Sequence, residues 1–362
     1  MNLNSFISAP LEDATADMSG ARVLIIPYMW IGDFVRCHTV VKLLRQRSPS
    51  TSIDMLTTSM VAPLLDYMPG VRKGIVADLP RRQLALKQHR ALARRLRAEN
   101  YDRVLIMPRT WKAALAPWLA AIPRRTGFVG EGRFALINDL RFGEHRLPRM
   151  ADRCAALALA KGERAPNQWP LPELKVPAAE CAGWRRRLGL ACDGRGIVAL
   201  APGAVGPAKR WPSAFYADLA RRLAGEGHWI WVIGGPNEKE LATEIAAAAG
   251  DIRDLTGPDM RDAILALAAA DVAISNDSGL LHVAAALGTP AVGIFGPTSP
   301  WHWAPLNPIA AVVETTDDLP CRPCHKPVCR LGHHRCMLGI SVDRVALSVR
   351  QAIARTPART SR

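Results

Sequence analysis

Residues Asp271–Leu287 read D-V-A-I-S-N-D-S-G-L-L-H-V-A-A-A-L, which is a short apolar strand, a polar turn and an apolar helix in succession. Three residues of the turn are favoured at the N-cap of a helix: Asn276, Asp277 and Ser278. A strand that passes through such a turn into a helix is the repeating unit of an α/β sheet. The stretch therefore predicts an α/β fold, with chemistry at the junction.

The junction is also suited to an anion. Gly279 has no side chain, so a ligand can approach the main chain, and the first N–H groups of a helix attract phosphate. Asp277 and His282 add polar groups beside this position. The alternative is an ordinary capped helix, in which His282 is a hydrogen-bonded core residue.

The same alternation runs through the chain. Apolar runs predict buried strands at residues 22–27, 52–57, 101–107, 196–201, 228–233, 271–275 and 291–295. After the first strand we predict a turn at Gly32–Asp33 and a helix through Leu44, and a basic helix follows Pro80. Further helices are predicted at residues 213–224, up to 249 and at 342–354. Such alternation predicts parallel sheets whose functional loops lie at the carboxyl ends of the strands.

Four prolines between residues 166 and 177 predict an extended linker, and 362 residues are many for one hydrophobic core. We therefore expect two doubly wound parallel-sheet domains, at residues 21–170 and 171–341, the second with a Cys-rich loop at 321–336. Residues 1–20 are expected to form a flexible extension, and residues 342–362 a C-terminal helix and an Arg-rich, mobile tail.

The composition indicates where the protein works and what it binds. No apolar run approaches the roughly 18 residues that span a bilayer, and the first twenty residues lack the features of a secretory signal. We therefore expect a cytoplasmic protein. Lys and Arg number 47 against 32 Asp and Glu, a formal charge of +15. This excess favours an anionic partner: nucleic acid, phosphorylated small molecules or an anionic membrane surface.

The positive charge is concentrated in the N-terminal half. Residues 81–125 hold twelve Lys or Arg and only two acids, with Trp111 and Trp118 among them. One interpretation is that this half binds an anionic ligand. The other is a set of solvated helix faces, since arginine favours helices.

Eight cysteines divide into two groups. The scattered group fits a reducing cytoplasm and consists of Cys37, Cys154, Cys181 and Cys192. The clustered group has the spacing C-x2-C-x4-C-x6-C and consists of Cys321, Cys324, Cys329 and Cys336. We expect this cluster to be a packed loop without metal. The alternative is a structural zinc site, because His325, His333 and His334 lie close by in the sequence.

Two further segments suit a nucleotide. The glycine- and proline-rich loop at residues 202–207 follows a predicted strand and precedes Lys209, so it offers main-chain N–H groups and an ammonium to phosphate. It matches neither a Walker loop nor a dinucleotide fingerprint. Glu238, just beyond Gly234-Gly235 at another strand end, is placed to accept a ribose hydroxyl. The alternative for both segments is ordinary surface residues.

Three motifs together carry a resemblance: P-G-A-V-G-P-A-K-R-W-P at 202–212, S-N-D-S-G-L-L-H-V-A-A-A-L at 275–287 and G-P-T-S-P at 296–300. From about residue 22 to 353 the sequence resembles the bacterial lipopolysaccharide heptosyltransferases, glycosyltransferase family 9, and within them the heptosyltransferase II group. Two further motifs fit the same resemblance: W-I-G-D at 30–33 and R-T-G-F-V-G-E-G-R at 125–133. Tyr28 and Met29 stand where the family usually has Pro-Ser.

The resemblance implies a GT-B fold, in which two Rossmann-like domains face a cleft, and an inverting transfer without metal or cofactor. The implied donor is ADP-heptose. The implied acceptor is heptosyl-Kdo2-lipid A of the lipopolysaccharide inner core, which receives its second heptose. We expect a monomer bound peripherally to the anionic cytoplasmic face of the inner membrane, with no nucleic-acid partner.

By the same resemblance, Asp33 matches the general base and Lys209 the diphosphate contact, so we expect both to be catalytic. The expected donor-binding residues are Gly203, Gly206, Lys209, Gly234, Glu238, Asp277, Ser278, Gly279 and His282. The expected acceptor-binding residues are Trp30, Gly32, Arg36, Arg109, Lys112, Arg125 and Arg133. Inverting transfer needs a carboxylate to accept the proton of the acceptor hydroxyl. The alternative for Asp33 is a plain turn residue.

Three other functions stay open at this point: a related heptosyltransferase with a different core acceptor, a GT-B nucleotide-sugar epimerase, and a zinc-containing nucleic-acid-binding protein. The epimerase would share the architecture but need no lipid acceptor. The last has neither a recognition-module spacing nor an RNA-binding aromatic signature in its favour.

Overall fold

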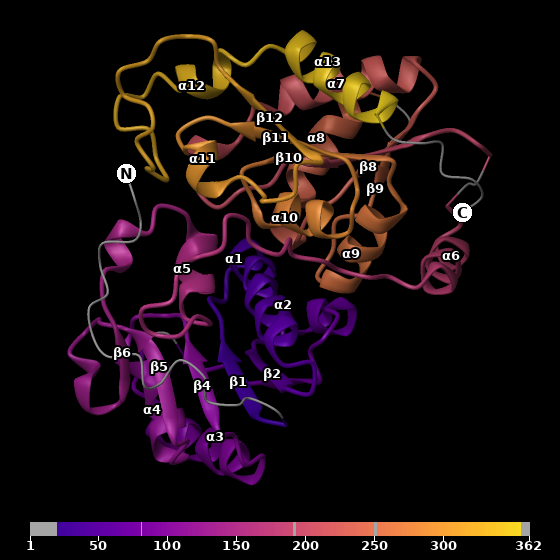
Figure 1. Cartoon of the computed structure of the whole chain (residues 1–362). Helices are drawn as coiled ribbons and strands as arrows, with labels where there is room; N and C mark the ends of the chain where they lie inside the picture. Colours follow the sequence, from indigo (N-terminus) through magenta and orange to yellow (C-terminus); the bar gives the residue numbers. More distant parts are fainter. Residues whose placement is uncertain (1–19, 81, 191–192, 250–251, 356–362) are drawn as a thin grey trace. The chain divides into compact units, whose positions relative to one another are not determined.

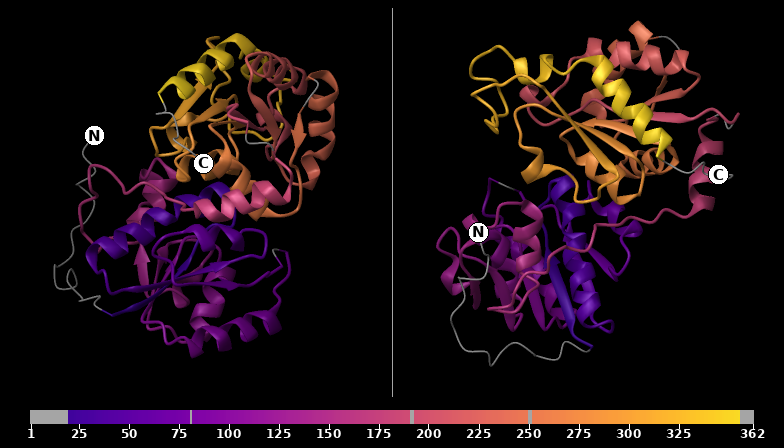
Figure 2. Two further views of the ribbon diagram at one scale, coloured as in Figure 1. Left: turned by 90° about the vertical axis from the view of Figure 1, so that its right-hand side faces the viewer. Right: turned by 45° about the horizontal axis from the view of Figure 1, so that its top comes forward.

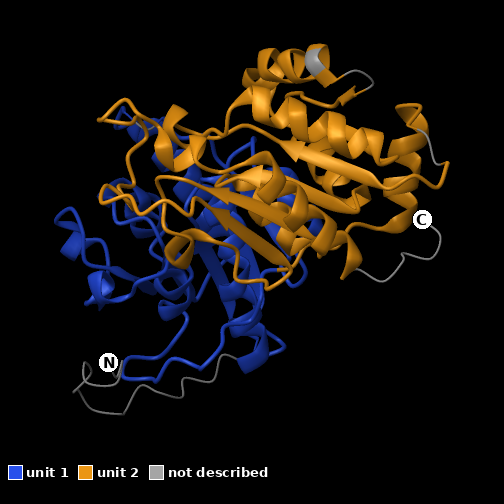
Figure 3. Ribbon diagram, turned by 90° about the horizontal axis from the view of Figure 1, so that it is seen from above, with its two compact units in different colours: residues 1–172 blue, residues 173–362 orange. Residues whose placement is uncertain are grey.

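The computed structural model describes residues 20–80, 82–190, 193–249 and 252–355. The predicted flexible extension, apart from Gly20, and the predicted mobile tail beyond Pro357 lie outside these residues. The chain divides into two units, residues 1–172 and 173–362, which Figure 3 colours separately. The proline-rich segment at 166–177 contains neither helix nor strand and spans this division.

The N-terminal unit is built on a six-stranded sheet in the order β3-β2-β1-β4-β5-β6. All neighbouring strands are parallel, and Val23 pairs with Ile53 on one side and with Arg103 on the other. The strands are β1 (Arg22–Ile26), β2 (Ser52–Thr57), β3 (Lys73–Val76), β4 (Arg103–Ile106), β5 (Arg124–Phe128) and β6 (Asp139–Arg141). The predicted parallel sheet is confirmed, but three strands were missed: β3 and β6 have only four and three residues, and β5 begins with two arginines.

Helices cover both faces of this sheet (Figure 2). Two of them, α3 and α4, pack against each other, and a separate group is formed by α1, α2 and α5. The helices are α1 (Ile31–Arg36), α2 (His38–Arg47), α3 (Leu86–Ala98), α4 (Trp111–Leu119) and α5 (Met150–Ala156). The predicted turn at Gly32–Asp33 is wrong, because both residues lie inside α1. The carbonyl of Trp30 already accepts the N–H of Phe34 at 2.8 Å, so the helix begins earlier than expected.

The C-terminal unit repeats this architecture in the order β12-β11-β10-β7-β8-β9 (Figure 1). Its strands are β7 (Ile197–Ala201), β8 (Trp229–Val232), β9 (Arg253–Asp254), β10 (Val272–Asn276), β11 (Ala291–Phe295) and β12 (Ala310–Glu314). They too are parallel. The strands predicted in this half are confirmed, whereas the edge strands β9 and β12 were not predicted.

Eight α-helices of the described residues belong to the C-terminal unit: α6 (Ala178–Arg187), α7 (Ser213–Gly225), α8 (Lys239–Ala249), α9 (Met260–Ala269), α10 (Gly279–Ala286), α11 (Pro300–Trp303), α12 (Arg335–Leu338) and α13 (Val342–Ala354). The last helix buries Val342, Val345 and Val349 in the core formed by the sheet and α7. It is therefore part of this unit and not an appendage. Within the described residues, no helix has both the length and the apolarity required to cross a membrane.

Both sheets therefore have a doubly wound strand order that reverses between two central strands, β1 and β4 in one unit and β7 and β10 in the other. Ligands of such sheets bind where the order reverses, beyond the carboxyl ends of these strands. The loops that follow β1, β4, β7 and β10 are accordingly the places where a site is expected.

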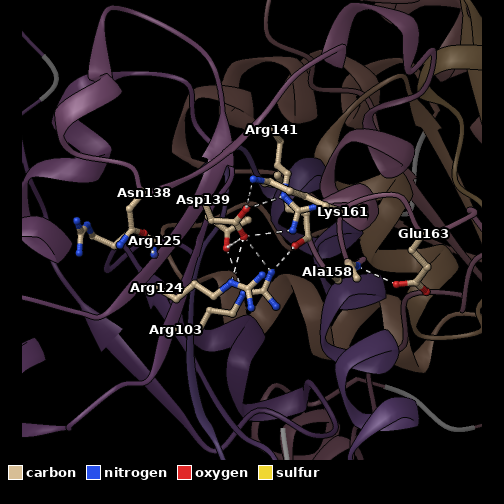
Figure 4. A network of polar contacts seen from close by, with 12 residues as sticks. Arg103, Arg124, Arg125, Asn138, Asp139, Arg141, Ala158, Lys161 and Glu163 are labelled. Carbon is tan, nitrogen blue, oxygen red and sulfur yellow. Dashed lines mark hydrogen bonds and ion pairs between the residues drawn. The ribbon is translucent and has the colours of Figure 1, made fainter. Parts of the chain in front are cut away.

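At the amino ends of β4, β5 and β6, Asp139 ties three strands together (Figure 4). Its carboxylate accepts from Arg124 Nε at 3.2 Å, from Arg141 Nε at 3.1 Å and from Thr126 Oγ1 at 2.8 Å. Burial alone would raise the pKa of Asp139, but Arg141 and the other donors lower it overall. Burial, followed by the charge of Arg124, lowers the pKa of Arg103 to about 10. This cluster lies at the edge opposite the carboxyl ends and has a structural role.

Candidate active site

An ion pair lies at the point where the strand order of the C-terminal sheet reverses. Lys209 lies in the loop that follows β7, Asp277 follows β10 directly, and Lys209 Nζ lies 2.7 Å from Asp277 Oδ2. Asp277 is buried, while about a quarter of the Lys209 side chain is exposed, at 26%. The structure thus brings together two residues that the sequence placed in separate motifs, at the edge where an α/β sheet binds its ligand.

Asn276, the last residue of β10, fixes the loop that carries Lys209. Its side-chain amide donates to the carbonyl of Pro202 at 2.6 Å, and its side-chain oxygen accepts from the N–H of Trp211 at 3.1 Å and from the Tyr216 hydroxyl at 3.2 Å. The amide is completely buried. The loop is therefore attached to the strand at both ends. The sequence interpretation of Asn276 as a helix cap is wrong, because its side chain is used on this loop.

The start of α10 presents its N–H groups without a side-chain cap. Ser278 occupies the N-cap position but makes no capping hydrogen bond, and its hydroxyl lies 3.0 Å from that of Ser275. The predicted capping by Asp277 is likewise wrong, since its carboxylate pairs with Lys209. His282 is buried in α10. An uncapped helix start beside Lys209 gives the positive electrostatic environment that a phosphate requires.

Glu238 lies against two glycine backbones. A Cβ atom on Gly203 would come within 2.6 Å of the Glu238 side chain, and one on Gly234 within 2.7 Å. Glu238 Oε2 accepts the N–H of Gly235 at 2.9 Å. Gly203 and Gly234 are therefore needed to bring the carboxylate beside the Lys209 loop, and the predicted donor residues Gly203, Gly234 and Glu238 form one group.

The Cys-rich segment packs onto the same loop, a relationship that the sequence did not predict. The carbonyl of Pro327 accepts the N–H of Ala208 at 3.0 Å. Gly206 has a left-handed φ of +96°, and a Cβ there would lie 2.9 Å from Pro327 main-chain atoms. Gly206 is therefore required twice, for its conformation and for this close contact.

His325 lies in the same Cys-rich segment, and its main-chain N–H donates to the carbonyl of Pro297. Its Nδ1 atom lies 3.3 Å from the indole Nε1 of Trp303, which donates the hydrogen bond. Burial, followed by the charges of His302 and Lys209, lowers its pKa, while Asp277 acts in the opposite direction. His325 is exposed but lies in the electrostatic environment of the ion pair.

The four clustered cysteines do not form an evident metal centre. Cys321 Sγ lies 3.8 Å from His333 Nε2, and main-chain N–H groups, that of His334 foremost, lower the pKa of Cys329. Across the described part of the chain, no group of three or more His, Cys, Asp or Glu side chains is arranged to hold a metal ion.

In the N-terminal unit, Asp33 follows β1 at the reversal point and is 9% exposed. It forms an ion pair with Arg36 one helical turn later, and Arg36 is 5% exposed. Cys37 ends α1, and its Sγ lies 3.7 Å from Cys154 Sγ in the interior. The buried partner keeps the Asp33 carboxylate in one orientation. Gly32 is buried beside it, and Trp30 is half exposed at the start of α1.

Arg109, which follows β4, lies at the same edge. Its Nη1 atom is 3.1 Å from Glu144 Oε2, and 60% of its side chain is exposed. Burial raises the pKa of Tyr28, and the charges of Glu144 and Asp33 contribute to the shift. Glu144 is buried and was not predicted, because it lies in an irregular segment without a motif. Lys112 lies further along, at the start of α4, where it donates to the carbonyl of Gln83 at 3.2 Å.

Two predicted acceptor residues have structural roles instead. Arg133 is 1% exposed and donates to the carbonyls of Phe128 and Pro108. Arg125 donates to the carbonyls of Leu136 and Ile122 at 2.8 and 2.5 Å. Burial lowers the pKa of both guanidinium groups. We no longer include Arg125 and Arg133 among the acceptor contacts, because their donors are directed to the main chain.

Two doubly wound sheets, one with an ammonium and an uncapped helix start at its reversal point and one with a buried carboxylate, define a glycosyltransferase of the GT-B class. Residues 89–334 match the family described as glycosyltransferase family 9 (heptosyltransferase). The chain belongs to this family.

Similar proteins cover nearly the whole chain. The lipopolysaccharide heptosyltransferase 2 of Escherichia coli K12 is 34% identical over 90% of this chain and 96% of its own length. The protein of the same name in Salmonella typhimurium is 35% identical with the same coverage. Among solved structures, E. coli ADP-heptose LPS heptosyltransferase II has a TM-score of 0.81 and 32% identity, covering 92% of this chain and 98% of that one.

Proposed function

We propose that the protein is an inverting heptosyltransferase that moves L-glycero-D-manno-heptose from ADP-heptose to heptosyl-Kdo2-lipid A, adding the second heptose of the lipopolysaccharide inner core. The observation that carries the proposal is the Lys209–Asp277 ion pair at the reversal point of the C-terminal sheet. The names of the relatives, which share a third of their residues over most of the chain, support the sugar and the acceptor.

The donor occupies the C-terminal unit. The loop at 202–209 and the start of α10 present main-chain N–H groups and the Lys209 ammonium to the diphosphate. Asp277 holds Lys209 in the position where the diphosphate arrives. Glu238 accepts a ribose hydroxyl, and Gly203 leaves room for the Glu238 side chain beside the loop.

Transfer forms a bond between the acceptor oxygen and the anomeric carbon while the bond from that carbon to the ADP diphosphate breaks. Asp33 takes the proton of the attacking hydroxyl, and Lys209 with the helix start stabilises the negative charge on the leaving ADP. A cation and helix N–H groups thus perform the service that other transferases obtain from a divalent metal. We expect transfer to continue undiminished in EDTA.

The acceptor is phosphorylated and anionic, so cationic groups of the N-terminal unit are its natural contacts. Arg109 is the most exposed of the predicted set, and Trp30 and Lys112 complete it, whereas Arg36 acts through Asp33. We propose that the enzyme works as a monomer at the cytoplasmic face of the inner membrane. Peripheral attachment is consistent with the formal charge of +15.

Mass spectrometry of the products separates the acceptors. ADP-heptose is incubated with the enzyme and either unheptosylated or mono-heptosylated Kdo2-lipid A. The proposal expects a gain of one heptose on the mono-heptosylated acceptor alone. Transfer to the unheptosylated acceptor, or release of free sugar without any acceptor, would assign a different reaction.

A further inference from the structure

The exposed face of α3 forms a basic surface that the proposed chemistry does not use. On α3, four cations repeat at the spacing of one helix face: Lys87, Arg90, Arg94 and Arg97. We call these four residues the α3 stripe. The opposite face of α3 buries His89, Leu92, Ala93 and Leu96. The stripe is exposed, so its charges face solvent.

Only two acidic residues, Glu99 and Asp102, lie between residues 79 and 130 of the sequence. Glu99 pairs with Arg72 and Lys73, and Asp102 accepts the main-chain N–H of Arg22. Lys87, Arg90 and Arg94 make no ion pair within the part of the chain that the structure describes, whereas Arg97 donates to the carbonyl of Leu119 at 2.6 Å. Three neighbouring cations on one helix face repel one another unless an anion lies opposite them.

Apolar side chains frame the stripe. Leu84 and Leu86, at the start of α3, are 41% and 43% exposed, and Trp118 near the end of α4 is 45% exposed. Two hydrogen bonds align the helices end by end: Lys112 to the Gln83 carbonyl at their starts and Arg97 to the Leu119 carbonyl at their ends. Leu119, the neighbour of Trp118, therefore contacts the last cation of the stripe, and Leu86 directly precedes the first cation in the sequence.

We propose that this face of α3 and α4 docks on the surface of an anionic phospholipid bilayer. Cations at the headgroup level, with leucine and tryptophan reaching the interface, are the pattern of a helix that lies on a membrane. Nucleic acid would use the cations but would leave the exposed leucines unused. The inference deepens the proposed function, which places the acceptor in a membrane, and assigns the attachment to particular residues.

Vesicle co-sedimentation tests the surface. The full-length protein is mixed with vesicles of phosphatidylethanolamine and phosphatidylglycerol, or of phosphatidylcholine alone. We expect binding to the anionic vesicles only. Since each cation near an anionic leaflet contributes about fivefold to partition, replacing Lys87, Arg90 and Arg94 by glutamine should lower it on the order of a hundredfold. Trp118→Ala should lower it several-fold without altering its salt dependence.

The matched control is a triple glutamine variant of Arg186, Arg253 and Arg344. These arginines are exposed in the C-terminal unit, and the variant has the same net charge as the stripe variant. It should bind vesicles like the parent protein. An equal loss of vesicle binding in both triple variants would show that binding depends only on net charge, which would overturn the proposal. Unchanged vesicle binding of the stripe variant would also overturn it. Tighter binding of duplex nucleic acid than of vesicles, lost in the stripe variant, would also overturn it.

Transfer activity is measured separately, with acceptor in neutral detergent micelles. The stripe lies outside the proposed catalytic and binding residues, so its variant should retain parental kcat with this acceptor. Failure of the parent protein to transfer heptose would reject the proposed function. Failure of the vesicle experiment would reject the docking surface alone.

Discussion

Lys209 Nζ lies 2.7 Å from Asp277 Oδ2, although 68 residues separate the two in the chain. The pair joins the loops that leave two neighbouring strands of the C-terminal sheet, β7 and β10. A cation held by a single carboxylate at this edge is positioned before the donor arrives, and its remaining protons are available to phosphate oxygens.

Removing this cation should affect donor binding and transfer together. In Lys209→Ala, we expect weaker ADP binding by calorimetry and a loss in kcat/KM of about a hundredfold or more, because the ammonium contacts the diphosphate in the ground state and the transition state. Lys239→Ala in the same unit is the control, because its partner Asp254 lies outside the proposed site. If Lys209→Ala had the kinetics of the parent protein, the proposed role of Lys209 in transfer would be wrong.

Asp33→Asn should abolish transfer while ADP affinity is retained. Loss of a general base lowers the rate by about a hundredfold to ten-thousandfold, and the asparagine keeps the shape of the side chain. Single-turnover kinetics measure the effect. Because Arg36 loses a charged partner in the interior, a thermal melt must show that the variant is folded. Asp66→Asn, an exposed acid of the same unit, should transfer normally.

Gly206→Ala should detach the Cys-rich segment from the Lys209 loop. The added Cβ would meet Pro327 main-chain atoms at 2.9 Å, and alanine disfavours a φ of +96°. We expect a clear loss of ADP affinity in a unit that is otherwise folded. Gly257→Ala tests the generality of the effect, because a Cβ there meets nothing within 4 Å. Equal affinities in both variants would contradict the assigned contact.

Asp139→Asn should destabilise the N-terminal unit without a direct effect on chemistry. Removing the charge leaves buried Arg141 without its ion-pair partner, which lowers the free energy of unfolding by about 3 kcal/mol. Urea unfolding measures the change, and Asp343→Asn, at a side chain that is 83% exposed, should change little. Because the pKa of Asp139 is lowered from 3.8, its contribution is present above pH 3.8 and is lost as pH falls through the folded value.

His325 should make the C-terminal unit sensitive to mild acid. Its pKa is lowered from 6.5 in the folded state, so the unfolded chain takes up the proton more readily. The free energy of unfolding should therefore fall as pH drops below 6.5, and His325→Gln should reduce that slope. An NMR titration of the imidazole checks the direction, and an apparent pKa above 6.5 would contradict it.

The sequence predicted the central strands well because their apolar runs are buried on both faces, as in β1, β7 and β10. It missed β5 and β6, where charged residues such as Arg124 and Asp139 occupy the sheet through mutual pairing. Periodicity carries no information about that compensation. The turn assigned to Gly32–Asp33 was wrong because a single glycine does not prevent a helix. The carbonyl of Trp30 accepts the N–H of Phe34, so both residues lie inside the first turn of α1.

The sequence motifs contain Lys209, Glu238 and Asp277, which in the structure follow β7, β8 and β10 of the C-terminal sheet. The pairing of Lys209 with Asp277 was not predictable, because it depends on the crossover that places β7 beside β10. Arginines misled most. Arg125 and Arg133 look like anion contacts in a sequence, but their donors are directed to main-chain carbonyls, and Arg133 is buried. Glu144 and His325 lie in irregular segments, so only the folded chain shows that they are near the strand ends.

Asn276 binds Pro202, Trp211 and Tyr216 with one amide group, so it holds both ends of the loop after β7 and the start of α7 to the end of β10. If the nucleotide binds at this loop as proposed, we expect the loop to keep this shape when it is bound. The loop has little conformational entropy to lose, so ordering it would cost little of the binding free energy. Rigidity of this kind favours rapid exchange of spent ADP for fresh donor, because no segment has to refold between turnovers.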